Sequence, residues 1–237
     1  MDHTVLDLAR LTPEAVPALI AGWHREHAVG DEFVVRGQWR GPVPFATVAL
    51  GAGTTVIGAT EGLGQAQWTL RRERTLADLI GPRLRVLVVG LNPSLVAADA
   101  GVGFAGATNR FWPAAVAAGL VPIDRDPWAA FTSARVGFTD LVKRASPRAD
   151  GLTTAEFADG AARLRALVDW FGPAVVCFAG VTGYRKAIDR HAALGAQPST
   201  FAGAAAYVMP NPSGVNTHAS LAELTTHFTA VRALAHD

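Results

Sequence analysis

The chain has 237 residues, half of them apolar, and its 21 Lys and Arg are balanced by 20 Asp and Glu. This length fits one large domain or one domain with a small appendage, and the balanced charge excludes a strongly basic global field. The single cysteine, Cys177, excludes an internal disulfide and a cluster held by four thiolates.

The start of the chain, MDHTVLDLAR, lacks the basic residues and apolar stretch of a signal peptide. No uninterrupted apolar run approaches the roughly 18 residues of a membrane span. We therefore expect a cytoplasmic protein with no membrane partner. HREH at 24–27 places two histidines three positions apart, but no other ligand cluster accompanies them, so we expect no metal site.

The elements expected before residue 76 are mostly short and β-like. Pro13 suits the first position of a helix over 13–27. Apolar runs broken by Gly and Pro then predict a meander of strands at 33–39, 45–50, 54–60 and 65–72. Residues 1–75 are therefore predicted to form a β-rich N-terminal extension, whose role the sequence leaves open.

After residue 75, strands and helices alternate. We expect a helical turn at 74–80, and then buried strands at 83–90, 174–180 and 206–210. The expected helices are 109–119, 153–171, 181–192 and 220–235, the second and the last of which begin with capping boxes. This alternation predicts an α/β fold, and we expect a three-layer α/β/α sandwich with a mostly parallel central sheet over residues 76–237.

Two Asn-Pro-Ser triplets, at 92–94 and 211–213, follow apolar runs. In parallel α/β sheets, ligands bind outside the carboxyl ends of the strands. Proline ends the strand and holds the preceding asparagine extended. We therefore expect Asn92 and Asn211 to line one cleft, although either triplet alone could be a simple turn.

More motifs follow the first triplet. GLNPS, FAGATNRFWPA (104–114), FTDLVKRAS (138–146) and NPSGVN (211–216) occur in this order. Together they resemble the mismatch-specific uracil/thymine DNA glycosylases, a branch of the uracil-DNA glycosylase superfamily, over about residues 76–234. Members of that family carry Gly-Ile-Asn-Pro-Gly, Phe-Ala-x-Pro-x-Asn-Arg-Phe-Trp and Asn-Pro-Ser-Gly-Leu motifs in the same order.

The resemblance implies an enzyme of base excision repair that needs no cofactor. It would flip uracil, or a related pyrimidine, out of a G·U or similar mismatch in double-stranded DNA and hydrolyse the N-glycosidic bond. Asn92 would orient the water, Phe104 would stack on the base beside Asn109, and backbone donors near Leu91 and Ser94 would meet the pyrimidine carbonyls. We expect a monomer, and a monofunctional enzyme because Lys143 and Lys186 are the only lysines.

The residues expected to contact DNA fall into two groups. From the NPSGVN motif, Gly214 and Val215 would enter the gap left by the flipped base, with Asn211, Ser213, Asn216 and His218 beside them. Arg110, Lys143, Arg144 and Arg148 could form a rim that contacts phosphates, or could be scattered solvated charges.

Four positions depart from the family pattern. Ser94 replaces a glycine, Ala107 a proline, and Val215 a leucine, while Asp140 stands where an uncharged polar residue is common. A serine beside the base could narrow the pocket against thymine. Asp140 could act as a general base or stabilise an oxocarbenium ion, and it could equally cap a helix beginning at Leu141.

Two other functions remain as alternatives. GVGFAG (101–106) spells the glycine pattern of a dinucleotide-binding enzyme, but it lies well beyond the end of the preceding strand. A glycosylase fold could also serve as a catalytically weak DNA-binding module. The presence of Asn92 argues against that second alternative.

Overall fold

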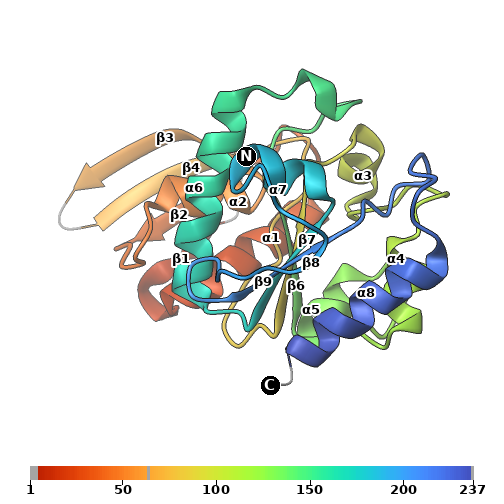
Figure 1. Cartoon of the computed structure of the whole chain (residues 1–237). Coiled ribbons are helices and arrows are strands. Elements are labelled where there is room, and N and C mark those ends of the chain that lie inside the picture. The colour runs from red at the N-terminus through yellow and green to blue at the C-terminus, as the bar shows by residue number, and fades with distance from the viewer. Residues whose placement is uncertain (1–4, 63–64, 236–237) are drawn as a thin grey trace.

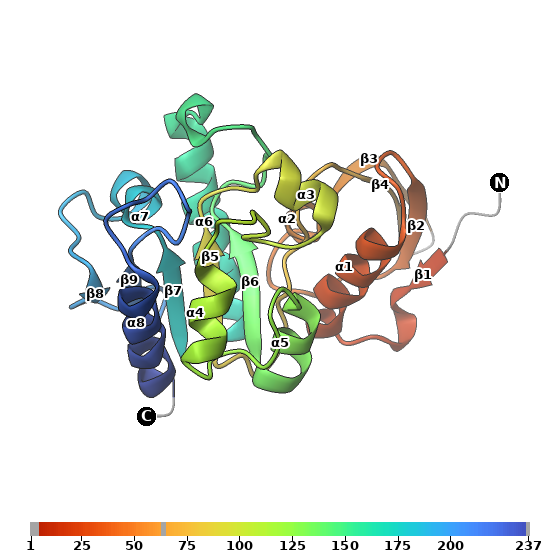
Figure 2. The same cartoon turned by 90° about the vertical axis from the view of Figure 1, so that its right-hand side faces the viewer.

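The computed structural model describes residues 5–62 and 65–235 and contains two sheets (Figures 1 and 2). The larger sheet has the strand order β6-β5-β7-β9-β8 and the smaller one β1-β2-β4-β3. The architecture is mixed α/β, with helices covering the sheets, as the sequence predicted. No helix among the described residues is long and apolar enough to cross a membrane.

Four parallel strands form most of the larger sheet. They are β5 (Val86–Gly90), β6 (Val136–Asp140), β7 (Val175–Ala179) and β9 (Ala205–Met209), and the two-residue β8 (Gly195–Ala196) pairs antiparallel at one edge. All residues of β5 and β7 are buried, which explains why both read as continuous apolar runs. The carboxyl ends of the parallel strands consequently share one edge of the sheet.

Alternate residues of β5 point into different cores. Leu87 and Val89 join a cluster with α6 (Thr154–Phe171) and α7 (Val181–Ala187). Val86 and Val88 join a second cluster on the other face. That cluster contains residues of α4 (Phe111–Ala117), α5 (Pro127–Ala134) and α8 (Leu221–Leu234). The period of two therefore buries both faces of the sheet and produces three layers.

The smaller sheet and its helices form the N-terminal layer. Its strands are β1 (Val5–Asp7), β2 (Glu32–Gly37), β3 (Thr54–Gly62) and β4 (Gln65–Arg72). Its helices are α1 (Val16–Glu26), α2 (Phe45–Gly51) and the 3-10 turns Leu8–Arg10 and Pro13–Ala15. Its separate apolar core reaches Ala166 and Trp170 of α6, which lies beside this layer in Figure 1.

Two of the expected elements in the first 80 residues were wrong. Residues 45–50 form helix α2 rather than a strand, because Phe45, Val48 and Ala49 bury one side of a helix that starts after Pro44. Residues 74–80 form no helix. They form a segment, called the strap below, that connects the N-terminal layer to the larger sheet. Within it, Leu79 makes an antiparallel bridge with Phe138 of β6.

The region after residue 90 contains further differences. Helix α3 (Leu95–Ala100), helix α5 and strand β6 were not predicted, although Ser94 and Asp126 cap the two helices in the usual way. Helix α7 ends at Ala187, short of the expected 192. The capping boxes of α6 and α8 were predicted correctly.

Candidate active site

A cavity of about 580 Å³ opens at the carboxyl ends of the parallel strands. Asn92 follows β5 and Asn211 follows β9, and both line the cavity as expected from the two Asn-Pro-Ser turns. Other residues that line the cavity near these strand ends include Gly90, Leu91, Pro93, Ser94, Phe104, Asn109, Asp140 and Ala179. All six residues singled out from the sequence for the catalytic and base-pocket roles therefore line this cavity.

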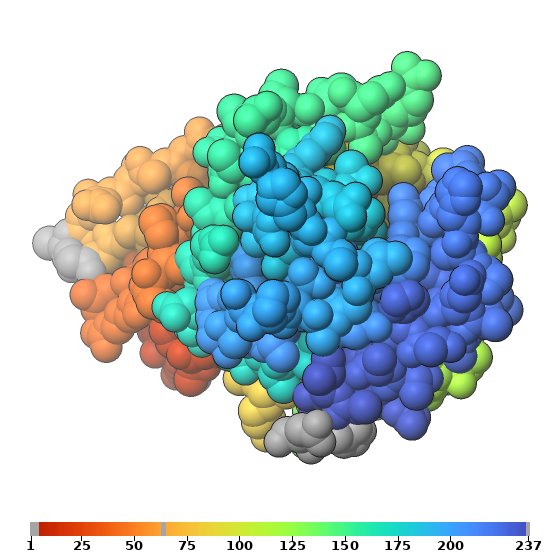
Figure 3. Space-filling model, in the orientation of Figure 1, coloured from red at the N-terminus to blue at the C-terminus, as the bar shows by residue number. Residues whose placement is uncertain are grey.

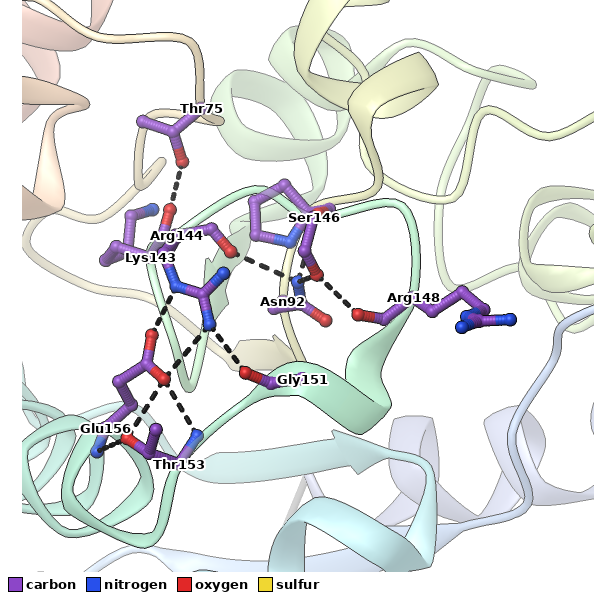
Figure 4. Close-up of polar contacts among 10 residues, drawn as sticks. Thr75, Asn92, Lys143, Arg144, Ser146, Arg148, Gly151, Thr153 and Glu156 are labelled. Carbon is purple, nitrogen blue, oxygen red and sulfur yellow. Dashed lines mark hydrogen bonds and ion pairs between the residues drawn. The ribbon is translucent and has the colours of Figure 1, made fainter.

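The orientation of the Asn92 amide follows from its hydrogen bonds (Figure 4). Its Nδ2 donates to the carbonyl of Arg144 at 3.1 Å and to Oγ of Ser146 at 2.8 Å. The Ser146 hydroxyl donates to the carbonyl of Arg148 at 2.7 Å, so its oxygen is left to accept from Asn92. Among the described residues, none donates to Oδ1 of Asn92, which is therefore free to accept a hydrogen bond from a ligand or water.

The loop that holds Asn92 is itself anchored to α6. Nε of Arg144 donates to Glu156 at 2.6 Å, and its Nη2 donates to the carbonyl of Gly151 at 2.9 Å. The hydrogen bond from Arg144 is the main cause that lowers the pKa of Glu156 to about 2. Arg144 was predicted to contact phosphate, but its guanidinium is engaged by this network (Figure 4). Ser146 was not singled out from the sequence, because nothing local reveals its contact with Asn92.

Asp140 ends strand β6 directly beside Gly90, the last residue of β5. Residues 141–148 form a loop and no helix, so the interpretation of Asp140 as a helix cap was wrong. Its side chain is buried on the cavity wall, and burial is the main cause that raises its pKa to about 6. The charges of Lys143 and Arg163 oppose this effect, whereas Asp78 adds to it. The group is a carboxylate at neutral pH that can also accept a proton.

A buried ionic cluster lies behind Asp140. Asp78 accepts from Nζ of Lys143 at 2.7 Å and from Nη1 of Arg163 at 2.6 Å, and it also accepts from the hydroxyl of Thr139. Nη2 of Arg163 donates to the main-chain carbonyl of Asp140 at 2.6 Å. Burial alone would raise the pKa of Asp78, but the two cations outweigh it and lower that pKa.

The cluster corrects the role expected of Lys143. Its side chain is only 5% exposed, and its ammonium also donates to the carbonyl of Leu76 at 2.6 Å. This position is fixed by the strap at 74–80, which the sequence predicted as a helical turn. Lys143 is therefore a structural partner of Asp78 and does not belong to an exposed phosphate-binding rim.

Phe104 lies on the cavity wall in an unusual backbone conformation. Its φ is +59°, a left-handed value that is strained for a bulky residue. Its ring stacks on the fully buried Phe111, with centroids 4.1 Å apart and planes 8° from parallel. Only the other face is left for a planar ligand.

Arg110 and Asn109 connect the FAGATNRFW segment to its surroundings. The Arg110 guanidinium donates to the carbonyls of Ser213, Asn216 and Ala219. This residue was expected to contact DNA phosphate, and in the structure its guanidinium holds the NPSGVN loop against the start of α4. The side-chain oxygen of Asn109 accepts from the N–H of Phe111 at 2.9 Å, which leaves its amide nitrogen for the cavity that it lines.

The NPSGVN loop presents an exposed tip. A Cβ on Gly214 would stand 2.1 Å from the hydroxyl of Thr108, so only glycine permits this close packing. Val215, next to it, is 88% exposed, and His218 is exposed as well. Asn211 accepts from the N–H of Ser213 at 3.0 Å, and the amide of Asn216 donates to the carbonyl of Asn211. These hydrogen bonds hold the start of the loop, whereas the apolar side chain of Val215 at its tip is exposed.

Ser94 and Leu91 complete the part of the cavity wall that contains Asn92. The Ser94 hydroxyl accepts from the N–H of Ala97 at 3.1 Å and caps α3, so its oxygen is directed to the helix while the residue lines the cavity. The carbonyl of Leu91 accepts from the N–H of Val142. In the part of the chain that the structure describes, the N–H groups of Leu91 and Ser94 donate to no protein acceptor.

The other motifs do not form sites. Gly101 ends α3 with φ +66°, and GVGFAG therefore follows a helix rather than a strand, unlike a dinucleotide-binding turn. His24 is buried and its Nε2 lies 3.2 Å from the carbonyl of Glu73, while His27 Nδ1 lies 2.8 Å from that of Trp23. Within residues 5–62 and 65–235, no group of three or more His, Cys, Asp or Glu is arranged to hold a metal ion.

Comparison with known proteins shows the family to which the chain belongs. The chain matches the family model of the uracil DNA glycosylase superfamily over residues 77–234, which is more than half of its length, and it belongs to that superfamily. A similar solved structure is the solution NMR structure of a candidate uracil DNA glycosylase from Methanosarcina acetivorans. It is 18% identical, covers 69% of this chain and 98% of its own, and aligns with a TM-score of 0.47. Membership supports a DNA N-glycosylase, a hydrolase of DNA repair, with DNA as its partner.

Proposed function

We propose that the protein is a monofunctional DNA glycosylase that flips uracil out of a mismatched duplex and excises it. The observation that carries this proposal is that one cavity presents both the free Oδ1 of Asn92 and the buried carboxylate of Asp140. Asn92, Asp140 and Phe104 would contact the reacting groups. The mismatch is favoured because extrusion of a poorly paired base costs the least free energy.

Asn92 is proposed to position the attacking water. An amide oxygen accepts a hydrogen bond from water but cannot take up its proton. The hydrogen bonds from Nδ2 to the carbonyls of Pro93 and Arg144 and to Oγ of Ser146 fix the amide so that this oxygen stays available. Asn92 therefore orients the attacking water, and the rate depends largely on how well the departing pyrimidine stabilises its negative charge.

Asp140 is proposed to supply the charge that Asn92 lacks. A carboxylate can take up the proton of the water, and it can also stabilise the positive charge that develops on the sugar. Its pKa of about 6 keeps it ionised at neutral pH and close enough to that pH to accept a proton. The unengaged N–H groups near Leu91 and Ser94 are proposed to stabilise the negative charge on the base.

Uracil is the expected preference over thymine. The two bases differ by a methyl group, which a pocket distinguishes by about 1–3 kcal/mol. Ser94 adds atoms to the wall where the related enzymes have glycine, and thymine is the poorer leaving group. The short wedge Val215 should also hold a well-paired base out of the duplex less effectively. Ala107 is exposed in the loop between α3 and α4, and its replacement of proline has no evident structural consequence.

The test is single-turnover excision on four substrates: uracil opposite guanine, uracil opposite adenine, uracil in a single strand, and thymine opposite guanine. Heat or alkali reveals the abasic site. We expect the first to react fastest and the last barely at all, and Asn92→Ala to abolish excision while retaining duplex binding. Excision of uracil by Asn92→Ala at the wild-type rate would refute the mechanism. A covalent adduct trapped with borohydride would refute monofunctional cleavage, because such an adduct requires an amine that attacks the sugar.

A further inference from the structure

The cavity extends beyond the part of the chain that matches the family model. Its lining includes Ala21, His24 and Arg25 of helix α1 and Arg72 of strand β4, all from the N-terminal layer. Next to them it is lined by residues 125–128 at the start of α5, where Trp128 lies against Arg25. Figure 2 shows α1 on the same side of the molecule as α3 and α5. The N-terminal layer therefore builds one wall of the candidate active site.

Two arginines on this wall form no ion pair with any residue that the structure describes. Arg25 is exposed and forms neither an ion pair nor a hydrogen bond with any residue that the structure describes. Its guanidinium lies over the ring of Trp128, 5.4 Å from the ring centroid, which leaves its N–H groups free. Arg72 uses only Nε, which donates to the carbonyl of His24 at 2.6 Å.

Two carboxylates near this wall have partners of their own. Asp99 forms an ion pair with Arg74 at 2.6 Å, and Asp126 accepts from the N–H of Ala129 at 2.8 Å to cap α5. Burial and the charge of Arg72 lower the pKa of His24 to about 4, so that His24 is neutral. Arg25 and Arg72 are consequently the two guanidinium groups on this wall that form no ion pair with a described residue, and the charge of Asp31 also acts on Arg72.

We propose that the wall formed by Arg25, Arg72 and Trp128 binds the phosphodiester backbone of the DNA strand that carries the flipped nucleotide. The proposal rests on the proposed function, since it assigns the strand on either side of the excised base to this wall. A cavity of about 580 Å³ is far larger than one pyrimidine needs and must also admit the attached sugar and phosphates. Guanidinium groups bind phosphate oxygens in a bidentate manner, and an adjacent indole can pack against a sugar or base.

The experiment measures the affinity of the full-length protein for a duplex at several salt concentrations. The duplex carries 2′-fluoro-deoxyuridine opposite guanine, because the electron-withdrawing fluorine opposes formation of the oxocarbenium ion and keeps the substrate intact. Two variants are compared, Arg25→Ala and Arg72→Gln, the second of which keeps a donor for the His24 carbonyl. Arg10→Ala is the matched control, since Arg10 is exposed on the same layer and does not line the cavity.

We expect Arg25→Ala to weaken binding roughly tenfold and to lower the slope of log K against log salt by about 1, as for one lost phosphate contact. Arg72→Gln should have a similar effect with an unchanged melting temperature, and Arg10→Ala should match the wild type. Wild-type affinity and slope in both test variants would overturn the proposal, even if the enzyme excises uracil. A wild-type protein that binds the duplex through Arg25 but excises no uracil would instead refute the proposed function and would support the DNA-binding role of this wall.

Discussion

Oδ1 of Asp140 lies 2.3 Å from the point at which a Cβ on Gly90 would stand. The carboxylate therefore occupies space that exists only because β5 ends in glycine. Gly90→Ala should push Asp140 out of position while leaving the strand intact, because a side-chain end can move where backbone cannot. We expect a loss of roughly tenfold or more in the single-turnover rate of uracil excision. Gly58→Ala on β3, where a Cβ would make ordinary contacts with Thr69, is the control and should excise normally.

Ser146 should act on the reaction through Asn92. Ser146→Ala removes one of the acceptors that hold Nδ2 of Asn92, so the amide should rotate and its oxygen should lose its fixed direction. We expect the single-turnover rate to fall about tenfold, with little change in duplex affinity, as for a lost orienting contact. Ser133→Ala removes an exposed hydroxyl that donates to the Ala129 carbonyl and serves as the control. A rate equal to that of the wild type would show that the loop holds Asn92 without Ser146.

The rate of excision should depend on pH through Asp140. Because its pKa is raised to about 6, the active carboxylate is lost as the pH falls through that value, and the rate should fall with it. In Asp140→Asn the rate should be low and should lack this step. Lys143→Met removes a charge that lowers the pKa of Asp140, so the midpoint should move to higher pH. A wild-type profile that is flat between pH 5 and 8, by single-turnover measurement, would exclude Asp140 from the reaction.

Stability should change with pH in the opposite sense. The pKa of Asp140 is higher in the folded protein than in the unfolded chain, so the folded state binds more protons between about pH 4 and 6. The free energy of unfolding of the wild type should therefore fall, relative to Asp140→Asn, as the pH rises through this window. The total change should be about 2–3 kcal/mol. Denaturant unfolding of both proteins at pH 4 and pH 8 measures it, and an unchanged difference would show that Asp140 is not desolvated.

The sequence predicted those parts of the fold that depend on local patterns. The capping boxes of α6 and α8 and the buried runs of β5 and β7 are legible because each requires only nearby residues. Asn92 and Asn211 were brought to one cavity because both follow parallel strands. Helix α2 was missed because its short apolar run fits a strand equally well, and only burial against the N-terminal layer decides between them.

The contacts of two cations near the site could not be predicted from the sequence. Arg110 and Lys143 look like free cations in the sequence, since their partners lie far away along the chain. Arg110 bonds carbonyls more than 100 residues away, and Lys143 pairs with Asp78. Such charge pairs and carbonyl contacts have no periodicity and no local signature. The same reason explains why Ser146, Arg25 and Arg72 were not singled out.

The strap at 74–80 also bears on how the molecule unfolds. The N–H of Asp78 donates to the carbonyl of Gly51, and a Cβ on Gly51 would stand 2.6 Å from Oδ2 of Asp78. The Asp78 carboxylate, which pairs with Lys143 and Arg163, thus packs against Gly51 at the end of helix α2 in the N-terminal layer. Opening that layer would leave two buried cations without their anion. The N-terminal layer and the larger sheet with its helices should therefore unfold as one cooperative unit, with a single calorimetric transition. The cavity wall that contains Asn92 and Asp140 should not stay folded once the N-terminal layer has unfolded.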